Sequence, residues 1–329
     1  MTSATRRGTT PRAPGLPDMV HEQSQHPLDV AIIGGGPAGL AAAVYLARFL
    51  RSVAVFDAGD PRARLIPRTH NCPGFPDGIG GEELLRRLRL QALSFGARIV
   101  ETPVKTLGRT DDHFTLSTNA GDVSARYVIL ATGIVDRPPP IADAWAGVEA
   151  GLVRLCPVCD AYEARGRRIG VIGREITALK EAEFLRHFSS NVVMLFSQPE
   201  DASTATRSQA SGAGIGLCDR TGEVVRLHDG FEVGKTDGTP PFRIDLLYAA
   251  MGCDVRSGLA AIVGANCDDH GYVLVGQHQE TSVPRLYAIG DVVQALNQIA
   301  VGFGHAALAA TDIHNALRHG DFPRPPAVG

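Results

Sequence analysis

A glycine-rich turn that follows a short apolar run constrains the fold of this chain more than any other feature. The run at residues 29–33 ends at the segment Gly34-Gly35-Gly36-Pro37-Ala38-Gly39, which fits the pattern G-x-G-x-x-G. In such a turn the first glycine permits the tight bend, the second lets backbone approach a pyrophosphate, and the third allows close helix–strand packing. The following helix offers unpaired N–H groups to phosphates. The candidate nucleotide-binding residues are therefore Gly34, Gly36, Pro37, Ala38 and Gly39.

The residues around this turn predict a complete strand–helix–strand unit. A helical stretch is expected over 37–49 and a second buried strand over 53–56. Asp57 ends that second strand, 18 positions after Gly39. A carboxylate at this place can accept hydrogen bonds from ribose hydroxyls, so the strand, the helix and the acid together predict dinucleotide binding.

The same pattern returns in the second half of the chain. Residues 168–172 predict a strand, Gly173 a turn, 177–188 a helix and 192–196 a further strand. The three prolines at 138–140 cannot continue regular structure, and a strand-like run at 246–250 leads to Gly252, so a domain crossing is expected at each place. We predict an α/β fold with two Rossmann-like three-layer nucleotide-binding domains, the second inserted into the first.

The predicted boundaries follow from these crossings. Residues 28–140 and 252–329 would form the first domain, 141–251 the inserted one, and 1–27 a disordered N-terminal tail. Other expected elements are a helix opening at residues 80–81, strands near 114–116, 123–130, 272–275 and 286–289, a mobile Ser-, Ala-, Thr- and Gly-rich loop over 203–216, and a terminal helix over 306–317.

Composition excludes several classes of function. The chain has 329 residues, a formal net charge of −3 and 44% hydrophobic residues. A near-neutral chain lacks the concentrated basic surface that nucleic-acid and anionic-membrane binders need. The most apolar stretch, residues 28–47, is interrupted by glycines and a proline, so no membrane span is predicted. We expect neither a nucleic-acid nor a membrane partner.

The N-terminal residues and the cysteines bear on location. Residues 1–27 have no apolar core, so no secretory signal is predicted. An acid-poor, Arg-containing leader can act as a transit peptide, whereas a disordered tail with Met19 as another possible start is the plainer interpretation. Most cysteines stand singly, which is typical of a reducing compartment, and a cytoplasmic location is expected; these are Cys72, Cys218, Cys253 and Cys267.

A close cysteine pair is the second chemical signal. In the segment Cys156-Pro157-Val158-Cys159-Asp160 the two thiols can close a small, easily reduced disulfide ring. The neighbouring carboxyl of Asp160 can carry the proton of an attacking thiolate. Half of a zinc site and two inert core thiols are the alternatives, but a zinc ribbon needs a second pair and the other cysteines are not paired in sequence. No metal site is predicted.

Together these motifs resemble the low-molecular-weight thioredoxin reductases over residues 28–318. The resemblance extends to Asn71-Cys-Pro-Gly-Phe, to Ala131-Thr-Gly, and to the segment from Thr281 to Asp291 that reads TSVPRLYAIGD. It implies an FAD-dependent enzyme, a homodimer, with FAD held by the glycine turn and Asp57 and by Asn71, Thr132, Gly133, Gly290, Asp291, Gln298 and Ile299. The ribityl chain would lie near Asp291 and the isoalloxazine ring near Gln298.

The resemblance also assigns roles at the cysteine pair. Cys159 would face the flavin and form the charge-transfer or C4a-adduct thiolate, and Cys156 would exchange with the substrate disulfide. Asp160 would act as general acid; a helix cap after the second cysteine is the alternative for this residue. His70 and His305 stand near presumed flavin contacts and can assist proton transfer, although a packing or surface role is the common one for histidine.

The sequence departs from this family in the inserted domain, which makes NADPH use doubtful. Where the family has a second glycine fingerprint, Glu175 replaces the glycine that admits a pyrophosphate and adds a like charge at an anion site. The family's basic triplet for the 2′-phosphate corresponds to Phe196-Ser197-Gln198, which offers no guanidinium. As an alternative, Arg167, Arg168 or Arg174 can rebuild an atypical pyridine-nucleotide site. The flavin segment also differs, because Asn297 replaces the arginine that precedes Gln298.

Three functional hypotheses follow. The favoured one is a thioredoxin-reductase-like FAD-dependent dithiol/disulfide oxidoreductase that moves electrons between flavin, the Cys156–Cys159 pair and an external disulfide. Its partner would be a thioredoxin-like protein or a small dithiol or disulfide, with ferredoxin or reduced flavin as possible donors. The alternatives are an oxygen-dependent dithiol oxidase and a non-enzymatic, flavin-bound redox sensor.

Overall fold

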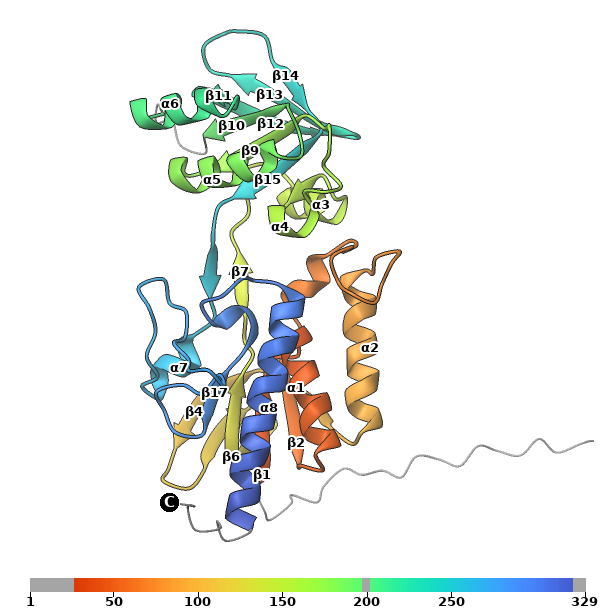
Figure 1. Ribbon diagram of the computed structural model, residues 1–329, viewed down its shortest axis with the longest axis vertical. Coiled ribbons are helices and arrows are strands. Elements are labelled where there is room, and N and C mark those ends of the chain that lie inside the picture. The colour runs from red at the N-terminus through yellow and green to blue at the C-terminus, as the bar shows by residue number, and fades with distance from the viewer. Residues whose placement is uncertain (1–26, 197–201, 322–329) are drawn as a thin grey trace, which may run out of the picture.

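The computed structural model describes residues 27–196 and 202–321, and the chain forms two lobes joined by a narrow waist (Figure 1). The tail expected over 1–27 lies outside the described residues except for Pro27, and so do Ser197 and Gln198 of the 2′-phosphate segment. Among the described residues, no helix combines the length and the apolar character needed to cross a membrane.

The larger lobe is built on a seven-stranded sheet. Its central strand β1 (Leu28–Ile33) is almost wholly buried and pairs in parallel with strands on both sides, as a continuous apolar run predicts. The order along the sheet is β3 (Arg98–Glu101), β2 (Val53–Asp57), β1, β6 (Gly121–Leu130), β5 (Phe114–Thr118) and β4 (Val104–Arg109), and β17 (Leu286–Ala288) also pairs with β6.

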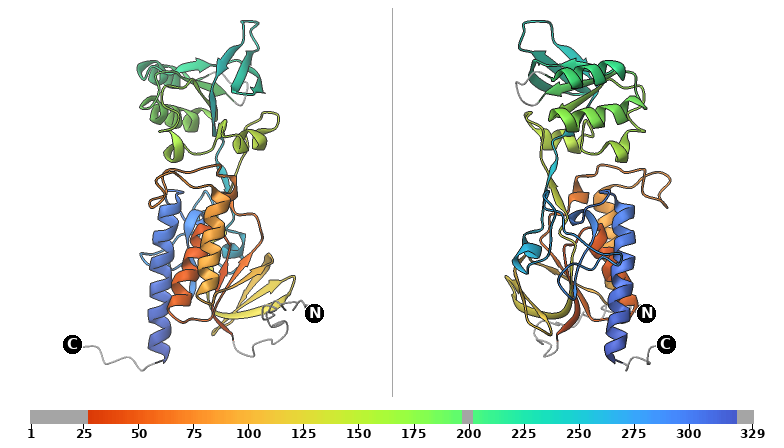
Figure 2. Two further views of the ribbon diagram at one scale, coloured as in Figure 1. Left: turned by 90° about the vertical axis from the view of Figure 1, so that its right-hand side faces the viewer. Right: turned by 60° about the vertical axis from the view of Figure 1, so that its left-hand side comes forward.

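Three helices cover one face of this sheet (Figure 2). They are α1 (Pro37–Arg48), α2 (Gly81–Ser94) and α8 (Ile299–Asp321). Helix α1 begins with Pro37, whose missing N–H and fixed φ suit a first helical position. Its buried alanines, Val44 and Leu46 form one apolar cluster with the sheet and with α8. The other face is covered by shorter segments, including α7 (Gly258–Ile262).

The smaller lobe contains a five-stranded sheet that is entirely parallel, unlike the larger sheet, in which β5 pairs antiparallel with β4 and β6. Its order is β11 (Gly216–Cys218), β10 (Val192–Phe196), β9 (Ile169–Gly173), β15 (Leu246–Ala250) and β8 (Val153–Arg154). Helices α5 (Glu175–Arg186) and α6 (Thr204–Gly212) pack on one side, and an antiparallel sheet of β12 (Thr221–Leu227), β13 (Gly230–Lys235) and β14 (Phe242–Ile244) lies on the other. The short helices α3 (Ala144–Glu149) and α4 (Pro157–Asp160) face the waist (Figure 1).

The waist consists of two strands that pair with each other. Strand β7 (Ile134–Asp136) leaves the larger lobe and β16 (Cys253–Val255) returns to it, in antiparallel register. This arrangement confirms the fold class, with the second Rossmann-like unit inserted into the first. The boundaries at 140/141 and 251/252 stay a prediction, and they fall beside this ribbon.

Some expected elements were wrong in detail. The loop expected over 203–216 contains the helix α6, because Ser203 caps it: the Ser203 hydroxyl accepts a hydrogen bond from the Thr206 backbone N–H at 3.2 Å. Residues 272–275 form no regular strand; Val273 and Val275 make isolated bridges instead. The last helix begins seven residues earlier than expected, at Ile299, and the helix expected from residue 177 begins at Glu175.

Candidate active site

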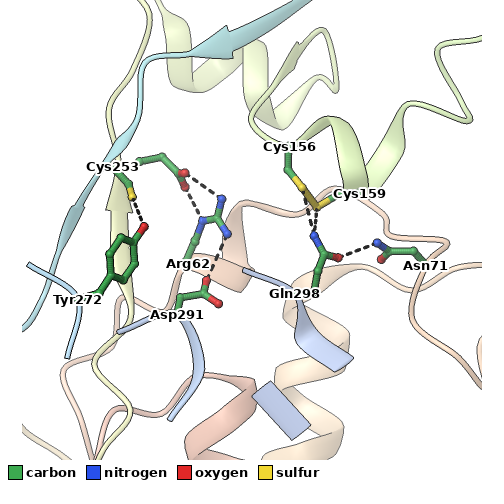
Figure 3. A network of polar contacts seen from close by, with 9 residues as sticks. Arg62, Asn71, Cys156, Cys159, Cys253, Tyr272, Asp291 and Gln298 are labelled. Carbon is green, nitrogen blue, oxygen red and sulfur yellow. Dashed lines mark hydrogen bonds and ion pairs between the residues drawn. A yellow bond between two sulfur atoms is a disulfide. The ribbon is translucent and has the colours of Figure 1, made fainter. Parts of the chain in front are cut away.

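The cysteine pair closes a disulfide at the start of α4, with an S–S distance of 2.05 Å. Cys156 precedes the helix and Pro157 occupies its first turn. Because α4 lies on the side of the smaller lobe that faces the larger one, the disulfide lies directly above side chains of the larger lobe (Figure 3). Cys156 and Cys159, the predicted redox pair, are therefore joined and lie between the lobes.

An amide chain from the larger lobe reaches the disulfide. The Gln298 Nε2 donates toward Cys159 Sγ at 3.2 Å and toward Cys156 Sγ at 3.4 Å. The Gln298 Oε1 in turn accepts a hydrogen bond from Asn71 Nδ2 at 2.9 Å (Figure 3). Asn71 is itself held by the Thr69 hydroxyl at 2.7 Å. Asn71 and Gln298, to which the resemblance gave flavin contacts, thus place a hydrogen-bond donor at the sulfur atoms.

A cavity of about 790 Å³ runs from the disulfide into the larger lobe. This volume falls within the range of small-molecule sites, roughly 300–1,000 Å³. Its lining includes nearly every residue predicted to bind cofactor or act in catalysis: Gly34, Gly36, Pro37, Ala38, Asp57, Asn71, Thr132, Gly133, Gly290, Asp291, Gln298, Ile299, Cys156, Cys159 and Asp160. Gly39 does not line it.

The glycine turn supports the assignment of different roles to its glycines. A Cβ on Gly39 would overlap the Gly34 carbonyl oxygen, so Gly39 serves helix–strand packing. A Cβ on Gly34 would overlap the Ala131 carbonyl, and Gly34 also has a φ of 119°. A Cβ on Gly36, by contrast, would meet nothing within 4 Å, because this glycine borders the cavity. The space that Gly36 leaves open suits a bulky polar group such as a pyrophosphate.

Asp57 occupies the place expected of the ribose acid. It ends β2, and its side chain lies so close to Gly35 that any side chain there would overlap it. One carboxylate oxygen of Asp57 accepts a hydrogen bond from the Gly59 backbone N–H at 2.9 Å, and the other lies 3.5 Å from an Arg89 nitrogen. The carboxylate is thus oriented at the rim of the cavity.

An arginine that the sequence did not indicate joins three parts of this site. Arg62 lies in the short helix at Arg62–Leu65 and makes two hydrogen bonds to the Asp136 carboxylate, at 2.6 and 2.9 Å. It also reaches Asp291 at 3.3 Å (Figure 3). Burial raises the pKa of Asp291, while the charge of Arg62 opposes that rise. No motif contains Arg62, so only the folded chain reveals it.

Asp160 is surrounded by partners from the inserted sheet. The Tyr248 hydroxyl donates to Asp160 Oδ1 at 2.8 Å, and an Arg154 nitrogen lies 3.5 Å from the same oxygen. Burial raises the pKa of Asp160, and Arg154 and Tyr248 partly offset this effect. The carboxylate thus bonds side chains, and it accepts no hydrogen bond from a helix N–H of residues 27–196 or 202–321, which disfavours the capping alternative. Tyr248 was detectable in the sequence as a polar group in an apolar strand.

The histidines and Cys72 take supporting places. His305 Nδ1 accepts a hydrogen bond from the Gly290 backbone N–H at 3.3 Å, and burial lowers the pKa of this histidine, so its neutral form orients the Gly290 turn. His70 is exposed at the cavity rim. Cys72 is buried and burial raises the pKa of its thiol, as expected of an inert core cysteine.

The second turn, in the inserted domain, differs from the first. Glu175 is the first residue of α5, and its carboxylate accepts a hydrogen bond from the Ser203 backbone N–H at 2.7 Å. Hydrogen bonds from Ser203 and Thr206 lower the pKa of Glu175, so the group is an anion at neutral pH. Among the arginines of the alternative phosphate site, Arg168 is paired with the Asp245 carboxylate. Residues 27–196 and 202–321 contain no cluster of ligands that could hold a metal ion.

Comparisons with known proteins agree with this geometry. The profile of the pyridine nucleotide-disulphide oxidoreductase family matches residues 28–319. The thioredoxin reductase of Streptomyces clavuligerus is 32% identical over 88% of this chain and 94% of its own length, and that of Mycolicibacterium smegmatis is 30% identical over 91% and 99%.

Solved structures share this fold, with TM-scores that differ between them. The crystal structure of HlmI, 26% identical, aligns over 90% of this chain and 94% of its own with a TM-score of 0.83. Lactococcus lactis thioredoxin reductase in the FR conformation, 25% identical, aligns over 89% and 99% but with a TM-score of 0.59.

Proposed function

The chain belongs to the pyridine nucleotide-disulphide oxidoreductase family, in its low-molecular-weight thioredoxin reductase class, and from this premise we propose the path of its electrons. It is a thioredoxin-reductase-like oxidoreductase that acts on disulfides. We propose that it moves two electrons between FAD, the Cys156–Cys159 pair and an external disulfide or dithiol. The observation that carries this proposal is the disulfide held over a cavity lined by a nucleotide-binding turn.

FAD fits the residues that line the cavity. The space beside Gly36 would admit its pyrophosphate, Asp57 would accept from its ribose, and Asp291 and Gln298 lie farther along the same cavity toward the disulfide. When bound, FAD supplies two-electron oxidation and reduction. The remaining roles of Asn71, Thr132, Gly133, Gly290 and Ile299 as cofactor contacts are proposals that their place in the lining supports.

The protein residues carry out the thiol chemistry. In the reducing direction Cys156 attacks a sulfur of the external disulfide, the external S–S bond breaks, and one thiol leaves with a proton. Cys159 then attacks Cys156 Sγ, which re-forms the internal disulfide and releases the second thiol. The two protons lost by the enzyme dithiol are those gained by the products. Gln298 Nε2, at 3.2 Å, would stabilise the Cys159 thiolate as a hydrogen-bond donor.

NADPH is not the donor in this proposal. At the second turn the fixed carboxylate of Glu175 occupies the helix N-terminus that would otherwise receive a phosphate, and like charges repel there. Reduced ferredoxin or reduced flavin would then supply electrons. The same observation favours a second candidate, in which the enzyme oxidises a dithiol and oxygen accepts the electrons.

A protein partner would need the lobes to move. The disulfide lies between them, and a thioredoxin-like protein would reach it after a rotation about the β7–β16 ribbon. The TM-score of 0.59 against the FR conformation, at 89% coverage, supports such a second arrangement. A small dithiol would need less movement. A homodimer and a cytoplasmic location also stay predictions; the free Cys72, Cys218, Cys253 and Cys267 favour a reducing compartment.

An anaerobic donor screen tests this proposal. The flavin-loaded protein is mixed in turn with NADPH, NADH, reduced ferredoxin, free reduced flavin and a small dithiol, and bleaching of the visible flavin band is followed. We expect rapid bleaching by a dithiol and by ferredoxin or flavin, and none by NADPH. The variant C156S should keep FAD and lose exchange with disulfides. Rapid bleaching by NADPH would contradict the argument from Glu175, and a colourless chain that takes up no FAD would contradict the whole proposal.

Peroxide measurement separates the two candidates. Dithiol-dependent formation of hydrogen peroxide in air, lost in C156S, is expected of the oxidase and not of a reductase. If C156S keeps every activity, the sensor hypothesis replaces both.

A further inference from the structure

A fully buried tyrosine directs its hydroxyl at Asp160, the candidate proton-transfer residue. Tyr248 lies in the middle of β15 and is 0% exposed. Its hydroxyl donates to Asp160 Oδ1 at 2.8 Å. Arg154, its register partner on the neighbouring strand β8, donates to the Asp160 backbone oxygen at 2.6 Å and lies 3.5 Å from the same carboxylate. Two adjacent strands therefore present one side chain each to Asp160.

Packing alone does not account for the hydroxyl of Tyr248. The other residues of β15 are leucines and alanines, all buried, and a phenylalanine ring would fill the same space. A phenol hydroxyl taken out of water without a partner destabilises the folded chain. The hydroxyl is compensated by Asp160 and, at 3.5 Å, by Arg154. The shorter of its two polar contacts is thus with the group proposed to handle protons at the disulfide.

The surroundings of Asp160 set opposing effects on its charge. Burial raises its pKa; the charge of Arg154 and the hydrogen bond from Tyr248 lower it, and the charge of Glu163 raises it. Helix α5, which packs against α4, contributes Ala178 and Ala182 to the apolar cluster that contains Ala161. Its acid Glu181 has a pKa raised by burial alone and is not coupled to Asp160. The Tyr248 hydroxyl is therefore one of two groups that favour the carboxylate.

We propose that Tyr248 is a positioning residue for proton transfer at the disulfide, which holds the Asp160 carboxyl in one orientation and stabilises its ionised form. This inference rests on the role of Asp160 in the proposed function. As Cys156 attacks an external disulfide, its proton passes to the Asp160 carboxylate. The external S–S bond breaks, a Cys156–substrate disulfide forms, and the departing sulfur takes the proton from Asp160. Asp160 must therefore be ionised before the attack, and the Tyr248 donor keeps it so.

The pH dependence of single-turnover exchange tests this role. Reduced flavin-loaded protein is mixed anaerobically with 2-hydroxyethyl disulfide, quenched with acid, and the loss of free Cys156 thiol is measured by mass spectrometry of its peptide. In the unaltered protein we expect the rate to rise over an acid limb as Asp160 ionises, and D160N to remove that limb. Y248F should move the limb to higher pH by about 0.5–1 unit, because one hydrogen bond to the carboxylate is lost.

A matched variant and a double variant distinguish a positioning role of Tyr248 from a general loss of structure. Tyr287 is another buried tyrosine that donates to a carboxylate, that of Asp312 at 2.5 Å, but it lies in the larger lobe. Y287F should leave the limb unmoved. In the D160N background, Y248F should have no further effect on the rate. Biosynthetic replacement of tyrosine by 3-fluorotyrosine makes the phenol a stronger hydrogen-bond donor and should move the acid limb to lower pH. The same replacement should not move the limb in Y248F. If Y248F folds poorly, the fluorotyrosine measurement still tests the inference.

The outcomes separate this inference from the function on which it rests. If D160N leaves the profile unchanged, the proposed role of Asp160 fails. If D160N removes the limb while Y248F and fluorotyrosine leave it in place, Asp160 keeps its role and the inference about Tyr248 is wrong. Equal slowing by Y248F with and without Asp160 would also overturn the inference, because it would show a structural effect that does not pass through the carboxyl.

Discussion

The chain has two strand–turn–helix units, one in each lobe. Both need a glycine where the turn meets the neighbouring strand, but they differ at the position that would face a phosphate. A Cβ on Gly34 would overlap the Ala131 carbonyl, and a Cβ on Gly173 would overlap the Ala250 carbonyl, so the first glycine is needed in both lobes by the neighbouring strand. Two residues later the units diverge: Gly36 borders the cavity, whereas Glu175 carries a carboxylate. The glycine that serves the sheet has been kept, and the one that would serve a phosphate has been replaced.

The helices after the two turns differ as well. Ala42 and Glu181 each lie eight residues after the first glycine of their turn. Ala42 is fully buried in the apolar cluster of the larger lobe. Glu181 brings a carboxyl to the equivalent position, and its Oε2 is buried without a hydrogen-bond partner in the described part of the chain. The inserted unit thus tolerates polar groups where the first unit is tightly apolar.

Adding a methyl group at the first turn should give the largest effect, on FAD affinity. Gly36 has an ordinary φ of −74° and free space around it, so G36A should fold normally. Its methyl group would occupy the place of a pyrophosphate, and we expect FAD affinity to fall at least about 100-fold, which corresponds to roughly 2.7 kcal/mol. Titration of the apoprotein with FAD measures this loss. G212A, at the end of α6 where a Cβ is also free, is the matched control. Unchanged FAD affinity in G36A would show that this turn does not bind the FAD pyrophosphate.

Neutralising Glu181 should have an intermediate effect, on stability. Burial raises the pKa of Glu181 from 4.5 to about 7, so the folded chain holds its proton where the unfolded chain has lost it. The contribution of Glu181 to the free energy of unfolding therefore falls as pH rises from about 4.5 to about 7. At pH 8, E181Q should increase the free energy of unfolding by about 2 kcal/mol, and near pH 4 the difference should vanish.

Urea unfolding at the two pH values measures that effect. Glu183, on the same helix, accepts a hydrogen bond from Gln209 at 2.7 Å, so E183Q is the matched control and should not stabilise the chain at pH 8. A difference between E181Q and the unaltered chain that is the same at both pH values would contradict the assignment to ionisation.

Removing the charge at the second turn should give the smallest effect. E175Q keeps an oxygen for the Ser203 N–H and abolishes the repulsion of an incoming phosphate. Because one exposed charge is involved, we expect NADPH affinity to rise only about fivefold. Equilibrium dialysis measures binding, with E183Q as control. A rise of several hundredfold, or a chain that already binds NADPH tightly, would show that the two turns are functionally alike.

The sequence predicted the parts of the molecule that depend on short-range patterns. Apolar strands followed by glycines specified the parallel strands of both sheets and the insertion, because burial on two faces leaves few other interpretations of β1 or β9. The cysteine pair and the cofactor turn were likewise local motifs. Helix α6 was missed because its Ser- and Thr-rich composition indicates a loop unless the cap at Ser203 is considered.

Contacts between distant segments were beyond that reasoning. Arg62 meets Asp136 and Asp291 across 74 and 229 positions, and nothing near Arg62 in the sequence signals the pairing. The approach of Gln298 to the disulfide depends on how the lobes sit, which no spacing encodes. Tyr248 is an intermediate case, since a polar group in an apolar strand indicates a buried partner without naming it.

The antiparallel pairing of β7 with β16 has a consequence for engineering and for evolution. The strand that enters the smaller lobe lies beside the strand that leaves it. That lobe can therefore be removed or exchanged as a unit, with only a short gap left to close. A relative's lobe, spliced at this ribbon, could change which electron source is used while the flavin-bearing half is inherited intact.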